Sequence, residues 1–148
     1  GEGEATPGGM PALHCRPMSN FDLGEIPVHL GLGATAVVQP PMAGGLAWYE
    51  AYEARHGSDG ADGRLVTMFT FEAPWTSWEM HPLGEELVLC VAGEVTLIQE
   101  HGGVPVPTVL RAGEAAINQR GVWHTADVSA PATVVFITAG VGTAHRPR

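Results

Sequence analysis

The sequence predicts an all-β fold, a sandwich or a barrel, for this chain of 148 residues. From Leu65 onward, short runs rich in β-branched and aromatic residues recur about every ten residues, with Gly and Pro between them. One stretch ahead of these runs has helical spacing instead. Repeated short strands separated by turn residues are typical of two packed sheets or of a closed barrel. The length suits a single domain that can bury a core without disulfides.

The first 63 residues predict a tail, an edge strand, a helix and a loop, in that order. Residues 1–20 are rich in Gly and Pro and lack a periodic pattern, so we expect a flexible leader ahead of one domain at 21–148. Residues 26–41 mix apolar residues with Gly and Pro, which is typical of a short irregular edge strand. Residues 44–57 place apolar and aromatic side chains near helical spacing between glycines and predict one short helix, and 57–63 predict a loop.

The rest of the chain reads as a series of short strands joined by turns. We expect a hairpin tip at 101–107, and tight turns at 111–114 and 119–124, because each contains glycine where the chain must reverse. The predicted strands lie at 65–71, 76–81, 86–91, 94–100, 109–118, 124–128 and 132–140.

Charge and composition exclude several classes of partner. With 7 Lys and Arg against 16 Asp and Glu, the net charge of −9 repels phosphate backbones and anionic lipid heads. No apolar run reaches the roughly 18 residues of a membrane-spanning helix. Nucleic acid and membrane are therefore not expected partners. Cys15 and Cys90 lie in unrelated contexts and form no disulfide framework, which favours a reducing, cytoplasmic setting.

Ionisable side chains gather on one face of the predicted strand at 76–81. Because side chains alternate along a strand, Glu79 and His81 share one face, while Trp78 points to the other. The bend at 82–85 then lets Glu86 return to the same side. A strand face with these groups predicts a pocket rather than a dry core.

Two segments around this face resemble the motifs of the cupin superfamily. The first cupin motif is G-x5-H-x-H-x(3,4)-E-x6-G, and Ala73 to Gly93 follow its spacing with Glu79, His81 and Glu86 at the ligand positions. The second, G-x5-P-x-G-x2-H-x3-N, is similar to 113–128 and places His124 at its histidine. The resemblance covers 65–140. It implies a jelly-roll barrel, or double-stranded β-helix, with the short helix and extra strands ahead of it.

The resemblance also implies a metal site. Cupins use three histidines and one glutamate, whereas this chain has Glu79 in place of the first histidine. The expected ligands are therefore two carboxylates and two imidazoles, a set that suits a divalent transition metal such as Fe, Mn, Zn or Ni. Such a metal keeps open positions for water or substrate oxygens. Glu79 is the candidate catalytic base. The expected ligands are Glu79, His81, Glu86 and His124.

Two functions from different classes remain open at this point. The first is a metal-dependent enzyme, dioxygenase-like (an oxidoreductase) or isomerase-like, acting on a small oxygenated molecule that chelates through adjacent oxygens. The second is a non-catalytic module that binds or senses a small ligand without an essential metal. Small cupins commonly pair, so the resemblance implies a homodimer as well.

The remaining histidines, tryptophans and Cys90 have plainer interpretations. Cys90 lies in an apolar run and is expected to be an inert small hydrophobe. The tryptophans near the motifs are expected to pack in the core, with stacking on an aromatic or sugar ligand as the alternative; they are Trp75, Trp78 and Trp123. The histidines expected at the surface or in loops are His29, His56, His101 and His145. His145 could also fold back over the barrel mouth.

Overall fold

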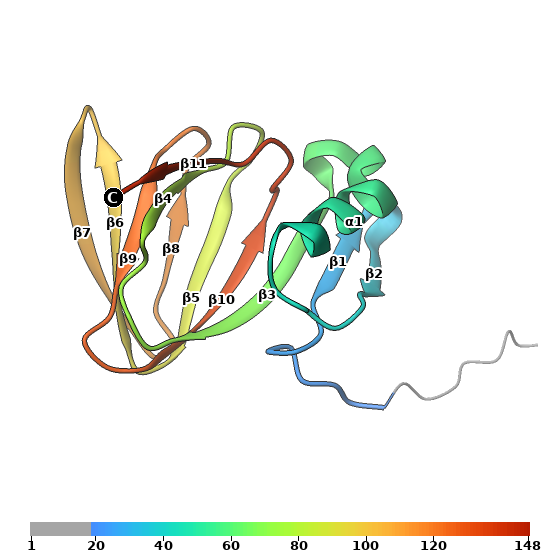
Figure 1. Cartoon of the computed structure of the whole chain (residues 1–148), viewed down its shortest axis with the longest axis horizontal. Coiled ribbons are helices and arrows are strands. Elements are labelled where there is room, and N and C mark those ends of the chain that lie inside the picture. Colours follow the sequence, from blue (N-terminus) through green and yellow to red (C-terminus); the bar gives the residue numbers. More distant parts are fainter. Residues whose placement is uncertain (1–18) are drawn as a thin grey trace, which may run out of the picture.

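The computed structural model describes residues 19–148, and Figure 1 shows two sheets facing each other with a helical layer beside one end. The leader predicted at 1–20 falls almost wholly outside the described residues, and so does Cys15. None of the helices in the described part of the chain has the length and the apolar run that a membrane crossing needs.

The strands form two antiparallel sheets in the order of a jelly roll, which confirms the predicted fold class. One sheet has six strands in the order β2-β1-β3-β10-β5-β8, and the other has five in the order β11-β4-β9-β6-β7. Within the barrel the chain changes sheet repeatedly, so that the first barrel strand, β3, pairs with the last, β10. The barrel strands are β3 Arg64–Phe71, β4 Ser77–Met80, β5 Glu86–Ala92, β6 Glu94–His101, β7 Val104–Arg111, β8 Ala115–Asn118, β9 His124–Asp127 and β10 Ala132–Thr138.

The segment ahead of the barrel widens one sheet and carries the helical layer. The single edge strand predicted at 26–41 is a hairpin of β1 Val28–Gly31 and β2 Thr35–Val38, joined by the short helix η1 Leu32–Ala34. The predicted helix is confirmed as α1 Leu46–His56. The predicted loop after it forms the 3₁₀ helix η2 Gly57–Asp62. This layer lies beside β1 and β3 in Figure 1.

Two strand assignments differ from the prediction. The predicted hairpin tip at 101–107 contracts to Gly102 and Gly103, both at positive φ, because β7 already begins at Val104. Prolines did not prevent this, since β7 is an edge strand and its outer amides need no partner. The predicted run at 109–118 divides at a turn through Gly113 into β7 and β8, which belong to different sheets.

A last strand, β11 Ala144–Pro147, was not predicted at all. It pairs antiparallel with β4 and places His145 opposite Glu79. Arg146 of the same strand lies over the rings of Trp78 and Trp123, at 5.1 and 4.6 Å from the ring centroids. Such cation–π contacts, together with the strand pairing, hold this end of the chain against the barrel.

The core lies between the two sheets. Cys90 is fully buried in it, and burial raises the pKa of its thiol, as expected of an inert small hydrophobe. Trp75 packs against this core, as predicted. The buried core residues are Val88, Cys90, Val95, Leu97, Leu110, Ala126, Ala132, Val134 and Phe136.

Candidate metal centre

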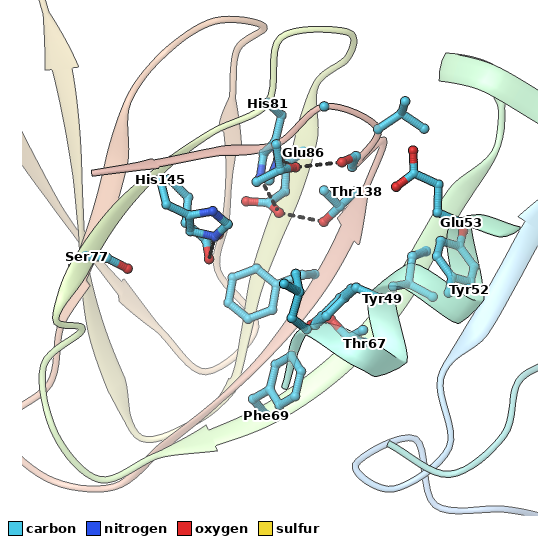
Figure 2. Close-up of a pocket in the computed structure, with 18 of the residues that line it drawn as sticks. Tyr49, Tyr52, Glu53, Thr67, Phe69, Ser77, His81, Glu86, Thr138 and His145 are labelled. Atoms are coloured by element: carbon cyan, nitrogen blue, oxygen red, sulfur yellow. Dashed lines mark hydrogen bonds and ion pairs between the residues drawn. The ribbon is translucent and has the colours of Figure 1, made fainter. Parts of the chain in front are cut away.

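Three barrel strands bring the four predicted site residues together. Glu79 on β4 lies directly opposite His124 on β9, and His81 follows the end of β4. Glu86 begins β5 in the facing sheet. Strand alternation puts Glu79 and His81 on one face, and the pairing of β4 with β9 and the facing strand β5 bring His124 and Glu86 to them. Figure 2 shows His81 and Glu86 side by side there.

Glu86 lies at the centre of this cluster and is 3% exposed. Its Oε2 lies 3.1 Å from Nε2 of His81, and its Oε1 lies 3.3 Å from Nε2 of His124. Two neighbouring strands fix the carboxylate from behind: the amide of Asn118 donates to Oε1 at 2.9 Å, and the hydroxyl of Thr138 donates to Oε2 at 2.5 Å. These two partners were not predicted, because only tertiary pairing brings β8 and β10 beside β5.

The donor atoms of the histidines fit a metal ion. Nε2 of His81 and Nε2 of His124 are buried, and neither has a hydrogen-bond partner among residues 19–148. Each of these nitrogens lies within ion-pair distance of Glu86. The other ring nitrogens are held, since Nδ1 of His81 lies 2.7 Å from Thr143 Oγ1 and Nδ1 of His124 lies 3.2 Å from the Val122 carbonyl. Imidazoles that are held through one ring nitrogen, with the other beside a carboxylate, are typical of metal sites.

Burial and local charges shift the pKa values of the two imidazoles in opposite directions. Burial lowers the pKa of His81, but the carboxylate of Glu86 outweighs burial and holds this pKa above its ordinary value. For His124, burial dominates and the pKa lies below its ordinary value. Burial would raise the pKa of Glu86, yet the two histidines and Thr138 together hold it below its ordinary value. The carboxylate is therefore ionised at neutral pH.

Glu79 occupies the outer side of the cluster and is more exposed than the other three. Its side chain is 30% exposed, and its Oε2 lies 4.0 Å from Nε2 of His124. Glu79, His81 and His124 each offer a ligand atom, and these atoms lie within 4.8 Å of one another. His145 Nε2 lies 3.3 Å from Oε1 of Glu79, so β11 adds an imidazole to the rim. His145 is exposed, as predicted, but it lies in a paired strand rather than a loop.

A pocket of about 860 Å³ connects this cluster with the helical layer. Figure 2 shows His81 and Glu86 at one end and Tyr49, Tyr52 and Glu53 of α1 at the other. Burial, followed by the charges of Glu79 and Glu86, raises the pKa of Tyr49, so the negative field of the site reaches across the pocket. Aromatic and aliphatic side chains line the space between, among them Leu65, Phe69, Phe71, Trp75 and Phe136.

Two of the histidines that were expected at the surface are buried or half-buried in the structure. His29 is 2% exposed rather than superficial, because β1 is covered by α1 and η2. His56 is half-buried at the end of α1 and stacks on His29. His101 is exposed at the end of β6, as predicted. No periodicity in 26–41 distinguishes a covered strand from an open one.

No protein-family model matches the chain. No curated protein matches it in sequence either.

Solved structures do resemble it. A cupin-2 domain protein from Shewanella frigidimarina is 18% identical with a TM-score of 0.44, and the match covers 57% of this chain and 71% of that one. A Klebsiella pneumoniae protein with a double-stranded β-helix domain is 24% identical with a TM-score of 0.48, covering 57% and 76%. Hydroquinone 1,2-dioxygenase from Sphingomonas is 17% identical with a TM-score of 0.42, covering 51% and 59%. At these identities and TM-scores the likeness assigns neither a family nor an activity to this chain.

The chain's own topology agrees with its motifs. The strand order is that of a jelly roll, a fold that cupins share. The residues that follow the first motif lie on β4 and β5, and the histidine of the second begins β9, so both motifs reach one cluster. In strand order this chain is a jelly roll, and the placement of both segments agrees with their resemblance to cupin motifs.

Proposed function

We propose that the chain is a metal-dependent enzyme acting on a small oxygenated molecule in this pocket. The observation that carries the proposal is the pair of buried Nε2 atoms of His81 and His124, which have no hydrogen-bond partner among residues 19–148 and lie beside a buried carboxylate. An uncoordinated buried nitrogen costs free energy, so an arrangement that keeps two of them favours a ligand for both. A divalent transition metal is that ligand.

Four residues would hold the metal. His81, His124 and Glu86 form the buried part of the set, and Glu79 completes it from the rim. Fe, Mn, Zn and Ni all suit such oxygen and imidazole donors. Bound there, the metal would supply Lewis acidity and, for Fe or Mn, redox chemistry.

Glu79 is proposed as the catalytic base. It is the more exposed of the two carboxylates and lines the pocket, so a substrate hydroxyl or an acidic C–H can approach it. His145 at 3.3 Å can hold the Glu79 side chain in place or carry its proton toward solvent, because His145 is itself exposed. Glu86, by contrast, is fixed by Asn118 and Thr138 and acts as a rigid ligand.

Reaction type and metal are tested together. Anaerobic calorimetry with Fe(II), Mn(II), Zn(II) and Ni(II) measures which ion binds near one equivalent. Oxygen uptake by the Fe or Mn form in the presence of candidate phenols and diols then identifies a dioxygenase-like reaction. Conversion of a substrate without oxygen uptake identifies an isomerase-like one. Failure of every ion to bind rules out the metal-dependent proposal.

One observation favours a second function, a non-catalytic module that binds or senses a small ligand. Both oxygens of Glu86 already have protein partners, so the barrel does not need a metal in order to fold. A stable metal-free barrel that binds small oxygenated molecules and returns them unchanged would support this alternative.

Replacing Glu79 by histidine is expected to maintain or raise the affinity for Zn(II) and Ni(II). The substitution restores an imidazole where Glu79 lies opposite His124, and imidazole is a strong ligand for both ions. Calorimetry on wild-type protein and Glu79→His measures the change, with Glu72→His as an exposed control outside the pocket. A loss of binding in Glu79→His would mean that Glu79 has a different role.

We also propose that the protein is a homodimer, as the resemblance to cupins implies. Light scattering coupled to gel filtration should then give twice the chain mass of 15.5 kDa. A mass of one chain at micromolar concentration would contradict the dimer and leave the metal site unaffected.

A further inference from the structure

A buried histidine joins a tyrosine of α1 to an aspartate of η2. Nδ1 of His29 lies 2.6 Å from the Tyr52 hydroxyl oxygen, and its Nε2 lies 2.7 Å from Oδ2 of Asp59. The hydrogen bond from His29 lowers the pKa of Asp59 below its ordinary value, so the carboxylate is ionised and can only accept. Nε2 of His29 therefore carries the proton, and the Tyr52 O–H donates to Nδ1.

This cluster is a hydrogen-bonded chain rather than a second metal site. His29, His56 and Asp59 have ligand atoms close enough for a metal. However, both nitrogens of His29 are already bonded, and its ring stacks on that of His56 at 4.0 Å and 17°. Imidazole lone pairs lie in the ring plane, so stacked rings aim them side by side instead of at one point.

Two glycines make room for the contact between His29 and Asp59. A Cβ on Gly63 would lie 2.8 Å from Cβ of Asp59 and 2.9 Å from Cε1 of His29. A Cβ on Gly31 would lie 3.0 Å from Oδ2 of Asp59 and 3.1 Å from Nε2 of His29. Both glycines have negative φ, at −103° and −80°, so close packing and not backbone conformation accounts for them.

The tyrosine end of this hydrogen-bonded cluster faces the pocket. Tyr52 lines the same space as His81 and Glu86, and Figure 2 shows it on the wall formed by α1. Its ring stacks on Trp48 at 5.7 Å and 9°, which fixes its direction. Burial and then the charge of Asp59 raise the pKa of Tyr52 to about 12, so the phenol stays protonated. Because its O–H is given to His29, its oxygen keeps a lone pair free for a ligand.

We propose that Tyr52, His29 and Asp59 form a proton relay that takes a proton from an acidic hydroxyl of a ligand in this pocket. The ligand O–H bond breaks as its proton passes to the Tyr52 oxygen, while the Tyr52 proton passes to Nδ1 of His29. The phenol ends neutral, His29 ends as an imidazolium beside the Asp59 carboxylate, and the ligand keeps the electron pair as an oxyanion. Phenols and enols are the substrate class that such a relay serves.

The relay deepens the proposed function and rests on it only in taking the ligand to be a small oxygenated molecule. Tyr52 is the residue that touches the ligand. His29 and Asp59 act through it, so their test needs a readout that a merely structural role would not move. The tautomer of His29 and the ionisation of a bound chromophore are two such readouts.

The first experiment is nitrogen NMR of histidine-labelled full-length protein at neutral pH. The relay requires His29 to carry its proton on Nε2 and to accept at Nδ1. Asp59→Asn should abolish that preference, whereas Tyr49→Phe, which removes a phenol from the same helix, should preserve it. The opposite tautomer, or an imidazolium at neutral pH in the free protein, overturns the relay.

The second experiment uses 4-nitrocatechol, whose visible absorbance reports its ionisation, with chelator-treated protein. We expect the pKa of the bound probe to be about one unit lower in wild-type protein than in Tyr52→Phe, a tenfold shift in its ionisation equilibrium. Asp59→Asn and Gly63→Ala should show the same loss, and Tyr49→Phe should not. A probe that does not bind, or that ionises equally in Tyr52→Phe and wild type, overturns the relay.

Repeating this experiment with metal-loaded protein separates the two proposals. Ionisation that appears only with metal, and equally in Tyr52→Phe, overturns the relay while supporting the metal site. Ionisation that depends on Tyr52 in a protein unable to bind any metal supports the relay and removes the metal-dependent function.

Discussion

Replacing His124 by alanine is expected to strip the protein of metal while the barrel stays folded. His124 is 1% exposed, and its Nε2 is buried without a hydrogen-bond partner among residues 19–148, so the substitution removes a ligand atom from the inside of the site. We expect affinity for Zn(II) to fall more than about 100-fold, beyond the effect of losing a supporting partner. Calorimetry and circular dichroism on the same sample measure both properties.

A histidine away from the pocket provides the control for this substitution. His101 is exposed at the end of β6, so His101→Ala should bind metal as wild-type protein does. Metal occupancy that is unchanged in His124→Ala would refute the assignment of His124 as a ligand. A loss of β-sheet signal in His124→Ala, with occupancy restored in His124→Gln, would instead indicate a role in folding.

Replacing Glu86 by alanine is expected to cause the largest loss of stability of any site substitution. The change leaves Asn118 and Thr138 without their acceptor in a buried place, and it leaves His81 without its counter-charge. Breaking a buried charge network in this way lowers the free energy of unfolding by about 3–5 kcal/mol. Urea denaturation of metal-free protein measures it.

The exposed pair of Glu94 and Arg111 provides the matched control. These side chains lie 3.4 Å apart but are more than half exposed, so Glu94→Ala should cost less than about 1 kcal/mol. An equal loss of unfolding free energy in Glu86→Ala and Glu94→Ala would contradict the buried charge network assigned to Glu86.

The loss of folding stability at acid pH is expected to follow from protonation of the same carboxylate, Glu86. Because the folded pKa of Glu86 lies below its ordinary value of 4.5, the carboxylate stabilises the metal-free fold above that value. This contribution is lost as the pH falls through the folded pKa. Glu86→Gln should therefore show a shallower decline in stability below about pH 5 than wild-type protein does.

The fold was predictable from strand periodicity where the two faces of a strand differ. In β6, Val95 and Leu97 are buried while Glu94 and Thr96 are not, and the sequence shows that alternation. β7 has prolines at 105 and 107, which the sequence pattern read as a turn. β11 carries Arg146 and Pro147 in four residues without alternation, so only its pairing with β4 makes it a strand.

The site was predictable in part, and the limit has a physical cause. Alternation within a strand placed Glu79 and His81 on one face, and the motif spacing supplied His124 from a distant strand. Contacts between strands that are far apart in the sequence leave no local trace, so the support of Glu86 by Asn118 and Thr138 was not predicted. For the same reason the sequence did not predict the contact of His145 with Glu79, or the burial of His29 between Tyr52 and Asp59.

Elemental analysis tests the central claim most directly. The tag-free protein, purified without chelator, is measured by plasma mass spectrometry before and after incubation with each divalent ion. The proposed site predicts iron, manganese, nickel or zinc near one equivalent per chain in wild-type protein, and none in His124→Ala. Wild-type protein that holds no metal after every incubation would contradict the metal centre and favour the ligand-binding module.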